Sequence, residues 1–228
     1  LRLAQLLAPN GTLFYPKDQL NPEEIQPRAD SASSVLNLVG YQTPTTPVST
    51  PLLGDHNQRN INVALQIIKR LGFDEALAIH SYQNFMPLPY RMTLSLALNG
   101  VQYINDSKAT NVHASCTGLE SVHAPLIVIT GGYDKGLTLT PLLECLRSRA
   151  KAVLCIGQTG LKIHQALLNS DVYSTYSGTL DVAVMAAYQR AQSGDIVILS
   201  PAASSFDQFK NFEDRGATFD TLVSSIVT

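Results

Sequence analysis

The second half of the chain alternates short apolar runs with segments of helical spacing. Residues 125–130 form a continuous apolar run, which is expected of a strand buried on both faces of a sheet. The turn signal Asn99-Gly100 joins two β-rich segments into a predicted hairpin. Strands that alternate with helices in this way predict an α/β fold with a doubly wound, mostly parallel, Rossmann-like sheet. The predicted strands are 92–98, 101–104, 125–130, 152–156, 172–175 and 195–199, and the predicted helices are 113–119, 140–149, 160–168, 179–192 and 207–226.

The first part of the chain, residues 1–55, is rich in proline and polar residues. It offers two short β-rich segments and a loop whose threonines and prolines are unfavourable for a helix. The predicted strands are 13–15 and 34–39, and the predicted loop is 41–51.

An apolar stripe with helical spacing then predicts a helix over residues 57–71, and Gly72 is a natural C-cap for it. A second short helix is predicted over 74–81. Two prolines, at 87 and 89, are typical of a linker, so we place a domain boundary there. The two predicted domains are 1–88 and 89–228.

Composition and charge narrow the class of protein. The 228 residues are 45% hydrophobic and 15% charged, an ordinary balance for a globular protein. The net charge of −2 does not indicate the excess of positive charge that binding to nucleic acid or to an anionic membrane requires. No apolar run approaches the ~18 residues that span a bilayer. Three cysteines without metal-like spacing and the lack of a secretory signal indicate a cytoplasmic protein. The chain begins with Leu1 rather than Met, which indicates a fragment or a processed chain.

Three predicted strands end in loops that are polar or rich in glycine. These loops cover residues 105–111, 131–136 and 200–207. Because the carboxyl ends of parallel strands meet at one edge of a sheet, Lys108, Lys135 and the serines should converge there. Glycines allow backbone N–H groups to approach an anion, and a helix N-terminus expected after Ser205 adds a positive dipole end. These features predict that a small anionic substrate binds at this edge. Each loop taken alone could instead be only a turn or a helix cap, and in the loop 105–111 the N-cap would be Thr110 or Asn111.

A second polar cluster, residues 54–60, opens the predicted helix. Asn57 and Asn60 are three residues apart and face the same way, and paired amides suit the edge of a nucleobase. Capping by Asp55 or Asn57 is the structural alternative. The five histidines lack HExxH or HxH spacing, and the chain has no Walker A, GxSxG or CxxC motif, so we predict no metal site within it.

Five stretches of the chain together resemble the Mur ligases, and within that family the branch that adds D-glutamate. They are collinear and span about residues 50–220. The Asp-Ser-Lys-Ala-Thr-Asn stretch and the long last stretch favour this branch over its siblings. The five stretches are 54–60, 87–91, 105–111, 131–136 and 199–216.

The resemblance implies a three-domain enzyme of which this chain holds two parts. Residues 1–88 would be the C-terminal part of the central ATPase domain, and residues 89–228 the C-terminal Rossmann-like ligase domain. The family's P-loop, Mg²⁺ ligands and carbamylated lysine would lie upstream of Leu1. The implied cofactors are ATP and Mg²⁺, and the implied substrates are D-glutamate and UDP-N-acetylmuramoyl-L-alanine. The implied protein is a cytoplasmic monomer with no nucleic-acid or membrane partner.

The resemblance also implies roles for individual residues. Those expected at the nucleotide are Asn57 and Asn60 at adenine, Asp106 at the ribose, and Arg91 and Lys108 at the phosphates. Those expected around D-glutamate are Thr110, Lys135, Ser205, the backbone at Phe206, and Phe212. Arg91 and Lys108 are the implied catalytic residues. Tyr90 stands where the family usually has a histidine before the arginine.

The implied reaction converts a substrate carboxylate into an acyl phosphate with ATP, and the amine of D-glutamate then displaces phosphate. Cationic Lys108 and Arg91 suit the charge on the transferring phosphoryl group, and Lys135 would pair with a glutamate carboxylate. A fragment without the P-loop is expected to be inactive alone.

Two other interpretations stay open. One is a non-catalytic Rossmann-like module that binds a nucleotide or an anion, although the missing GxGxxG motif argues against a dinucleotide. The other is a related Mur or folate-polyglutamating ligase, against which the serine-rich segment 200–209 argues.

Overall fold

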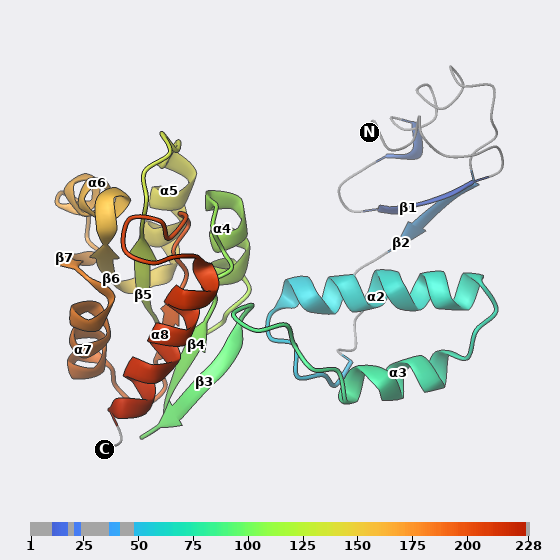
Figure 1. The fold of residues 1–228 in the computed structure, drawn as a ribbon. Helices are drawn as coiled ribbons and strands as arrows, with labels where there is room; N and C mark the ends of the chain where they lie inside the picture. The colour runs from blue at the N-terminus through green and yellow to red at the C-terminus, as the bar shows by residue number, and fades with distance from the viewer. Residues whose placement is uncertain (1–10, 18–20, 24–36, 42–47, 227–228) are drawn as a thin grey trace. The chain divides into compact units, whose positions relative to one another are not determined.

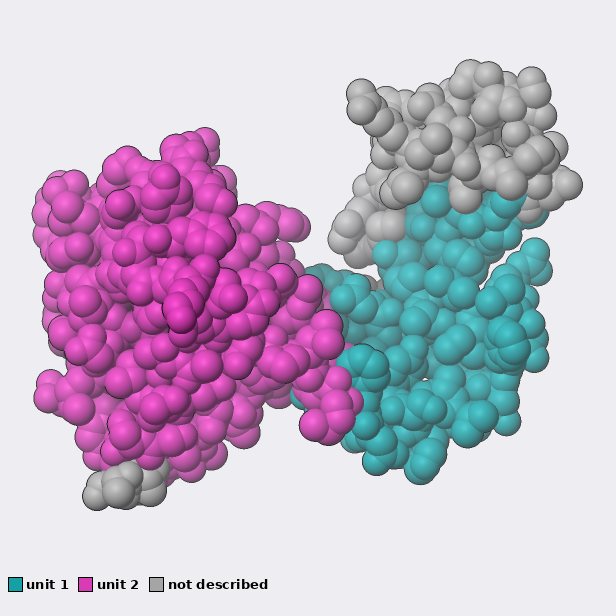
Figure 2. Space-filling model, viewed as in Figure 1, with its two compact units in different colours: residues 1–51, 57–85 teal, residues 52–56, 86–228 magenta. Residues whose placement is uncertain are grey.

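The computed structural model describes residues 11–17, 21–23, 37–41 and 48–226. The chain divides into two compact units, which Figure 2 colours separately. Unit 1 comprises Leu1–Pro51 and Asn57–Phe85, and unit 2 comprises Leu52–His56 and Met86–Thr228. Most of the predicted site residues belong to unit 2.

Unit 1 contains a short parallel sheet, in which β1 (Thr12–Pro16) pairs with β2 (Asn37–Tyr41). The predicted strand over 13–15 is confirmed. The second predicted strand, 34–39, is found at Asn37–Tyr41 and ends two residues later than expected. Its residues 34–36 lie outside the described residues, as do residues 42–47 of the predicted loop.

Two helices follow the sheet of unit 1, as predicted. α2 (Asp55–Arg70) buries Ile61 and Leu65, which are four residues apart and so share one face. α3 (Glu75–Gln83) is N-capped by Asp74, whose carboxylate accepts hydrogen bonds from two backbone N–H groups of the first turn.

Unit 2 is built on a six-stranded sheet with the strand order β3-β4-β8-β5-β6-β7. β3 is antiparallel to β4, and all the other pairs are parallel. The fold is therefore α/β with a mostly parallel sheet, as predicted. The strands are β3 (Thr93–Leu98), β4 (Val101–Asn105), β5 (Leu126–Gly131), β6 (Ala150–Ile156), β7 (Tyr173–Gly178) and β8 (Ile196–Leu199).

Helices cover both faces of this sheet (Figure 1). α4 (Val112–Glu120), α5 (Thr140–Arg149) and α6 (Gly157–Leu167) pack on one face, and α7 (Leu180–Arg190) and α8 (Phe212–Ser225) pack on the other. Alternate strand residues point to the two faces. Ile104, Val128, Val153 and Ile198 join the first core, and Tyr103, Ile127, Leu154 and Val197 join the second.

One helix boundary differs from the prediction in a way that matters for the site. The last helix begins at Phe212, not at residue 207, because Asn211 caps it by accepting a hydrogen bond from Asp214 N (2.7 Å). Asp207 instead accepts a hydrogen bond from Gln158 N at the start of α6 (3.1 Å). The prediction of a helix N-terminus directly after Ser205 was therefore wrong. Residues 200–211 form an irregular loop instead.

Candidate functional site

Three loops leave the carboxyl ends of adjacent strands and touch one another. They are the β4 loop (residues 106–111), the β5 loop (132–136) and the β8 loop (200–211). Gly131 N donates to Pro201 O (2.9 Å), and Tyr133 N donates to Ser204 O (2.8 Å), which joins the β5 and β8 loops. The predicted convergence of these loops is confirmed.

A fully buried arginine, Arg215 on α8, joins the β4 and β8 loops. Its Nε donates to Ser107 Oγ (3.0 Å), its Nη2 to Ser107 O (2.9 Å) and its Nη1 to Ala203 O (3.1 Å). Burial lowers the pKa of this guanidinium to about 10, which leaves it charged at neutral pH. Sequence reasoning missed Arg215, because most arginines are exposed and no local signal marks this one.

Asp106 in the β4 loop is buried, and both of its carboxylate oxygens have partners in the protein. Oδ1 accepts from Met92 N (3.3 Å), and Oδ2 accepts from Ser200 Oγ (3.2 Å), which itself lies 2.5 Å from Ser115 Oγ. Burial raises the pKa of Asp106 to about 7, although these two hydrogen bonds and the charge of Arg91 oppose the rise.

Two lysines of the site lie over aromatic rings. Lys108 Nζ is 3.7 Å from the centroid of the Phe212 ring, and Lys135 Nζ is 5.5 Å from that of Phe206. Neither ammonium forms an ion pair with a carboxylate among the described residues. A cation on an aromatic face keeps its full charge, so both lysines can still pair with an anion.

The other predicted residues of unit 2 lie on the β4 and β8 loops, except Arg91, which precedes β3. Thr110 is partly buried, and Asn111 after it caps α4 by accepting from Ala114 N (2.9 Å), so the capping alternative holds for Asn111. Ser205 is buried, Phe206 is 61% exposed and Arg91 is exposed.

Asn57 and Asn60 belong to unit 1 and lie on α2. The helix begins at Asp55, so Asn57 is already within it and is not its N-cap.

Two of the three glycines at the β5 strand end and loop, Gly131 and Gly136, do not present the free N–H groups that were expected. Gly131 N donates a hydrogen bond to Pro201 O, and Gly136 N donates one to the carboxylate of Asp134 (2.9 Å). Gly131 is instead required for packing, because its φ is 117° and a Cβ there would lie 2.0 Å from Ile156 O.

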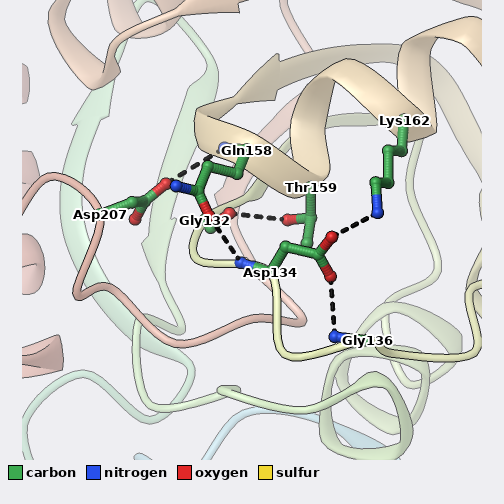
Figure 3. A network of polar contacts seen from close by, with 7 residues as sticks. All are labelled: Gly132, Asp134, Gly136, Gln158, Thr159, Lys162 and Asp207. Atoms are coloured by element: carbon green, nitrogen blue, oxygen red, sulfur yellow. Dashed lines mark hydrogen bonds and ion pairs between the residues drawn. The ribbon is translucent and has the colours of Figure 1, made fainter.

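The β5 loop is attached to the first two turns of α6 by a network of polar contacts (Figure 3). Asp134 forms an ion pair with Lys162, and Asp134 N donates to Gln158 Oε1 (3.2 Å). Thr159 contacts Gly132 O through both its N (2.9 Å) and its Oγ1 (3.1 Å). Sequence reasoning selected neither Gln158 nor Lys162, since both lie far from the loop in the sequence.

The described residues include neither a cluster of metal ligands nor a membrane-spanning helix. No group of three or more His, Cys, Asp or Glu side chains is placed to hold a metal ion. No described helix combines the length and the apolar character needed to cross a bilayer.

The geometry defines a Rossmann-like α/β domain with a cationic edge, and sequence comparison defines its family. Residues 90–203, half of the chain, match the family model for the Mur ligase glutamate ligase domain. The chain belongs to the Mur ligase family, as the resemblance predicted.

Curated relatives support a particular branch of this family. The UDP-N-acetylmuramoylalanine--D-glutamate ligase of Latilactobacillus sakei subsp. sakei is 36% identical over 184 residues, which cover 80% of this chain and 40% of the relative. The protein of the same name from Solibacter usitatus is 39% identical over 176 residues, which cover 77% and 40%. This chain thus spans about two fifths of the length of these relatives.

Solved structures share the fold. E. coli FolC in complex with DHPP and ADP aligns with a TM-score of 0.67 at 16% identity, over 98% of this chain and 56% of that one. The bifunctional folylpolyglutamate synthase/dihydrofolate synthase from Yersinia pestis CO92 aligns with a TM-score of 0.66 at 15% identity, over 99% and 55%. At this identity the likeness shows the fold alone, and it agrees with the predicted α/β class.

Proposed function

We propose that this chain is the C-terminal part of an ATP-dependent ligase that adds D-glutamate to UDP-N-acetylmuramoyl-L-alanine in peptidoglycan synthesis. The observation that carries the proposal is that Lys108 and Lys135, both without a carboxylate partner among the described residues, lie on loops that converge at one edge of the sheet of a Mur ligase domain. The names and identities of the curated relatives support the choice of D-glutamate.

The D-glutamate part of the proposal rests on the β4, β5 and β8 loops. Lys135 would pair with a glutamate carboxylate. Thr110, Ser205, the backbone at Phe206, and Phe212 would complete the surroundings of the amino acid. Since the Phe206 ring holds Lys135 without neutralising it, the loops offer a carboxylate of the amino acid a cation that pairs with no carboxylate among the described residues.

The nucleotide part rests on Arg91, Lys108 and Asp106, with Asn57 and Asn60 at adenine. Exposed Arg91 and partly buried Lys108 fit the charge of a polyphosphate. ATP would supply the phosphoryl group that activates the substrate carboxylate, and the two cations would stabilise its charge during transfer. Among the described residues no group of three or more His, Cys, Asp or Glu side chains could hold Mg²⁺, and in this proposal the protein ligands of Mg²⁺ come from elsewhere in the protein.

The same proposal covers domain organisation. Residues 1–88 would belong to the central ATPase domain and residues 89–228 to the ligase domain. The enzyme would act as a monomer in the cytoplasm, where ATP and the nucleotide-linked substrate are available.

The experiment uses the longest natural chain that contains these residues. Phosphate release from ATP is measured with UDP-N-acetylmuramoyl-L-alanine and either D-glutamate or L-glutamate. The proposal predicts release that depends on D-glutamate and not on L-glutamate. Release without any amino acid, or equal release with another amino acid, would contradict it.

A further inference from the structure

The residue before Lys135 creates an electrostatic problem for an anion site. Asp134 carries a negative charge directly beside the lysine that would bind a substrate carboxylate. A free aspartate at this position would compete with the substrate for the ammonium group of Lys135. The structure pairs Asp134 with a different cation, Lys162 on α6.

The pairing with Lys162 is part of a wider attachment of the β5 loop (Figure 3). The second carboxylate oxygen of Asp134 accepts from Gly136 N (2.9 Å), which closes the loop around Lys135. The backbone N of Asp134 donates to Gln158 Oε1 (3.2 Å). Lys135 therefore lies between two residues, 134 and 136, whose backbone N–H groups are both held.

The side chain of Lys135 is left free to meet an anion. Its Nζ lies 5.5 Å from the centroid of the Phe206 ring and pairs with no carboxylate among the described residues. Lys162 thus cancels the charge of Asp134, and the charge of Lys135 is retained.

We propose that Lys162 is a positioning residue for D-glutamate: it neutralises Asp134 and fixes the β5 loop, so that Lys135 is available to the substrate carboxylate. This inference rests on the proposed function, since it assigns Lys135 to D-glutamate. Lys162 acts only through Asp134 and Lys135, and its ammonium group does not contact the substrate.

The test compares variants of the full-length enzyme by steady-state kinetics with D-glutamate. Lys162→Met keeps the apolar stem and removes the charge, so Asp134 is left to compete for Lys135. We expect the KM for D-glutamate to rise about three- to fivefold, the size expected for one exposed ion pair, with kcat unchanged. Lys162→Arg, which keeps the charge, should retain the wild-type KM.

A double variant separates the electrostatic role from a merely structural one. Asp134→Asn keeps an oxygen that can accept from Gly136 N but removes the competing charge. Combined with Lys162→Met, it should return the KM for D-glutamate to near the wild-type value. A loop that had only lost an attachment would not recover in this way.

The matched control is Lys151→Met. Lys151 forms an ion pair with Asp195 (2.7 Å) at the amino-terminal end of β6, the opposite edge of the sheet from the loops. Its loss should leave the KM for D-glutamate unchanged.

Two results would overturn the inference: an unchanged KM in Lys162→Met, or no recovery in the double variant. Both are read against a wild-type enzyme that uses D-glutamate. A wild-type enzyme with no dependence on D-glutamate would refute the proposed function itself, and the two failures are therefore distinguishable.

Discussion

Burial decides the charge state of Asp106. The residue is 6% exposed, and this burial raises the pKa of its carboxyl from 3.8 to about 7, although the hydrogen bonds donated by Met92 N and Ser200 Oγ oppose the rise. At neutral pH this residue is therefore close to half ionised, within a loop proposed to meet a nucleotide.

The raised pKa of Asp106 makes a prediction for stability. Between pH 3.8 and 7 the folded state binds a proton that the unfolded state has lost, so this group's contribution is full below pH 3.8 and declines as the pH rises through about 7. The decline is at most about 4 kcal/mol. Urea unfolding from pH 4 to pH 8 should show wild-type protein losing stability relative to Asp106→Asn. Parallel curves for the two proteins would refute the raised pKa.

Lys135 makes a prediction for substrate binding. Lys135→Ala in the full-length enzyme removes a cation that would pair with a carboxylate, and the KM for D-glutamate should rise about tenfold or more. The KM for ATP should change little, because the proposed nucleotide contacts lie on other residues. An unchanged KM for D-glutamate would remove Lys135 from the site.

At the scale of elements, α8 is attached to two loops by a single side chain. Arg215 donates to Ser107 and Ala203 from within the core, where its three acceptors have no access to water. Asn105 Nδ2 adds a second contact by donating to Gly216 O (2.9 Å) on the same helix. The position of Lys108 and Phe212 therefore depends on the packing of α8.

Arg215→Lys tests this attachment. Lysine cannot reproduce the three-donor geometry of the guanidinium, and the acceptors left without partners should cost about 2–4 kcal/mol of unfolding free energy. Arg190→Lys, at an exposed arginine stacked on Tyr173, is the control and should cost less than about 1 kcal/mol. Equal losses in the two variants in chemical unfolding would contradict the assigned role of Arg215.

The glycines of the β5 segment provide a second test at this scale. Gly131→Ala would place a Cβ 2.0 Å from the backbone oxygen of Ile156, whereas Gly136→Ala meets no atom within 4 Å. Both glycines have a positive φ, so both variants carry about 1–3 kcal/mol of backbone strain, the larger part at Gly131 with its φ of 117°. Gly131→Ala should cost more than about 2 kcal/mol beyond that, because it forces β5 away from β6. Similar melting temperatures for the two variants would show that the close approach is absent.

At the scale of the whole molecule, sequence patterns predicted the fold better than the site. The apolar run over residues 125–130 corresponds to β5. A strand that is buried on both faces of a sheet carries apolar side chains at successive positions, so that its sequence is easy to recognise. The meeting of the three loops followed from the parallel topology. The start of α8 was misplaced, because the pattern from residue 207 suits a helix while Asp207 is bonded to α6.

The parts of the site that the sequence could not predict are long-range contacts. Arg215 and Ser107 are 108 residues apart, and Lys162 and Asp134 are 28 residues apart. No local propensity specifies such pairs, which form only when the sheet has brought their elements together.

The proposed activity of the protein to which these loops belong is the joining of D-glutamate to a nucleotide-linked substrate. Mass spectrometry of the nucleotide product is the most direct test, with the longest natural chain, ATP, Mg²⁺, UDP-N-acetylmuramoyl-L-alanine and isotope-labelled D-glutamate. We expect one labelled glutamyl residue per product molecule, and none when these 228 residues, which lack a P-loop motif, are used alone. ATP consumption without a glutamyl product, or equal incorporation of L-glutamate, would contradict it.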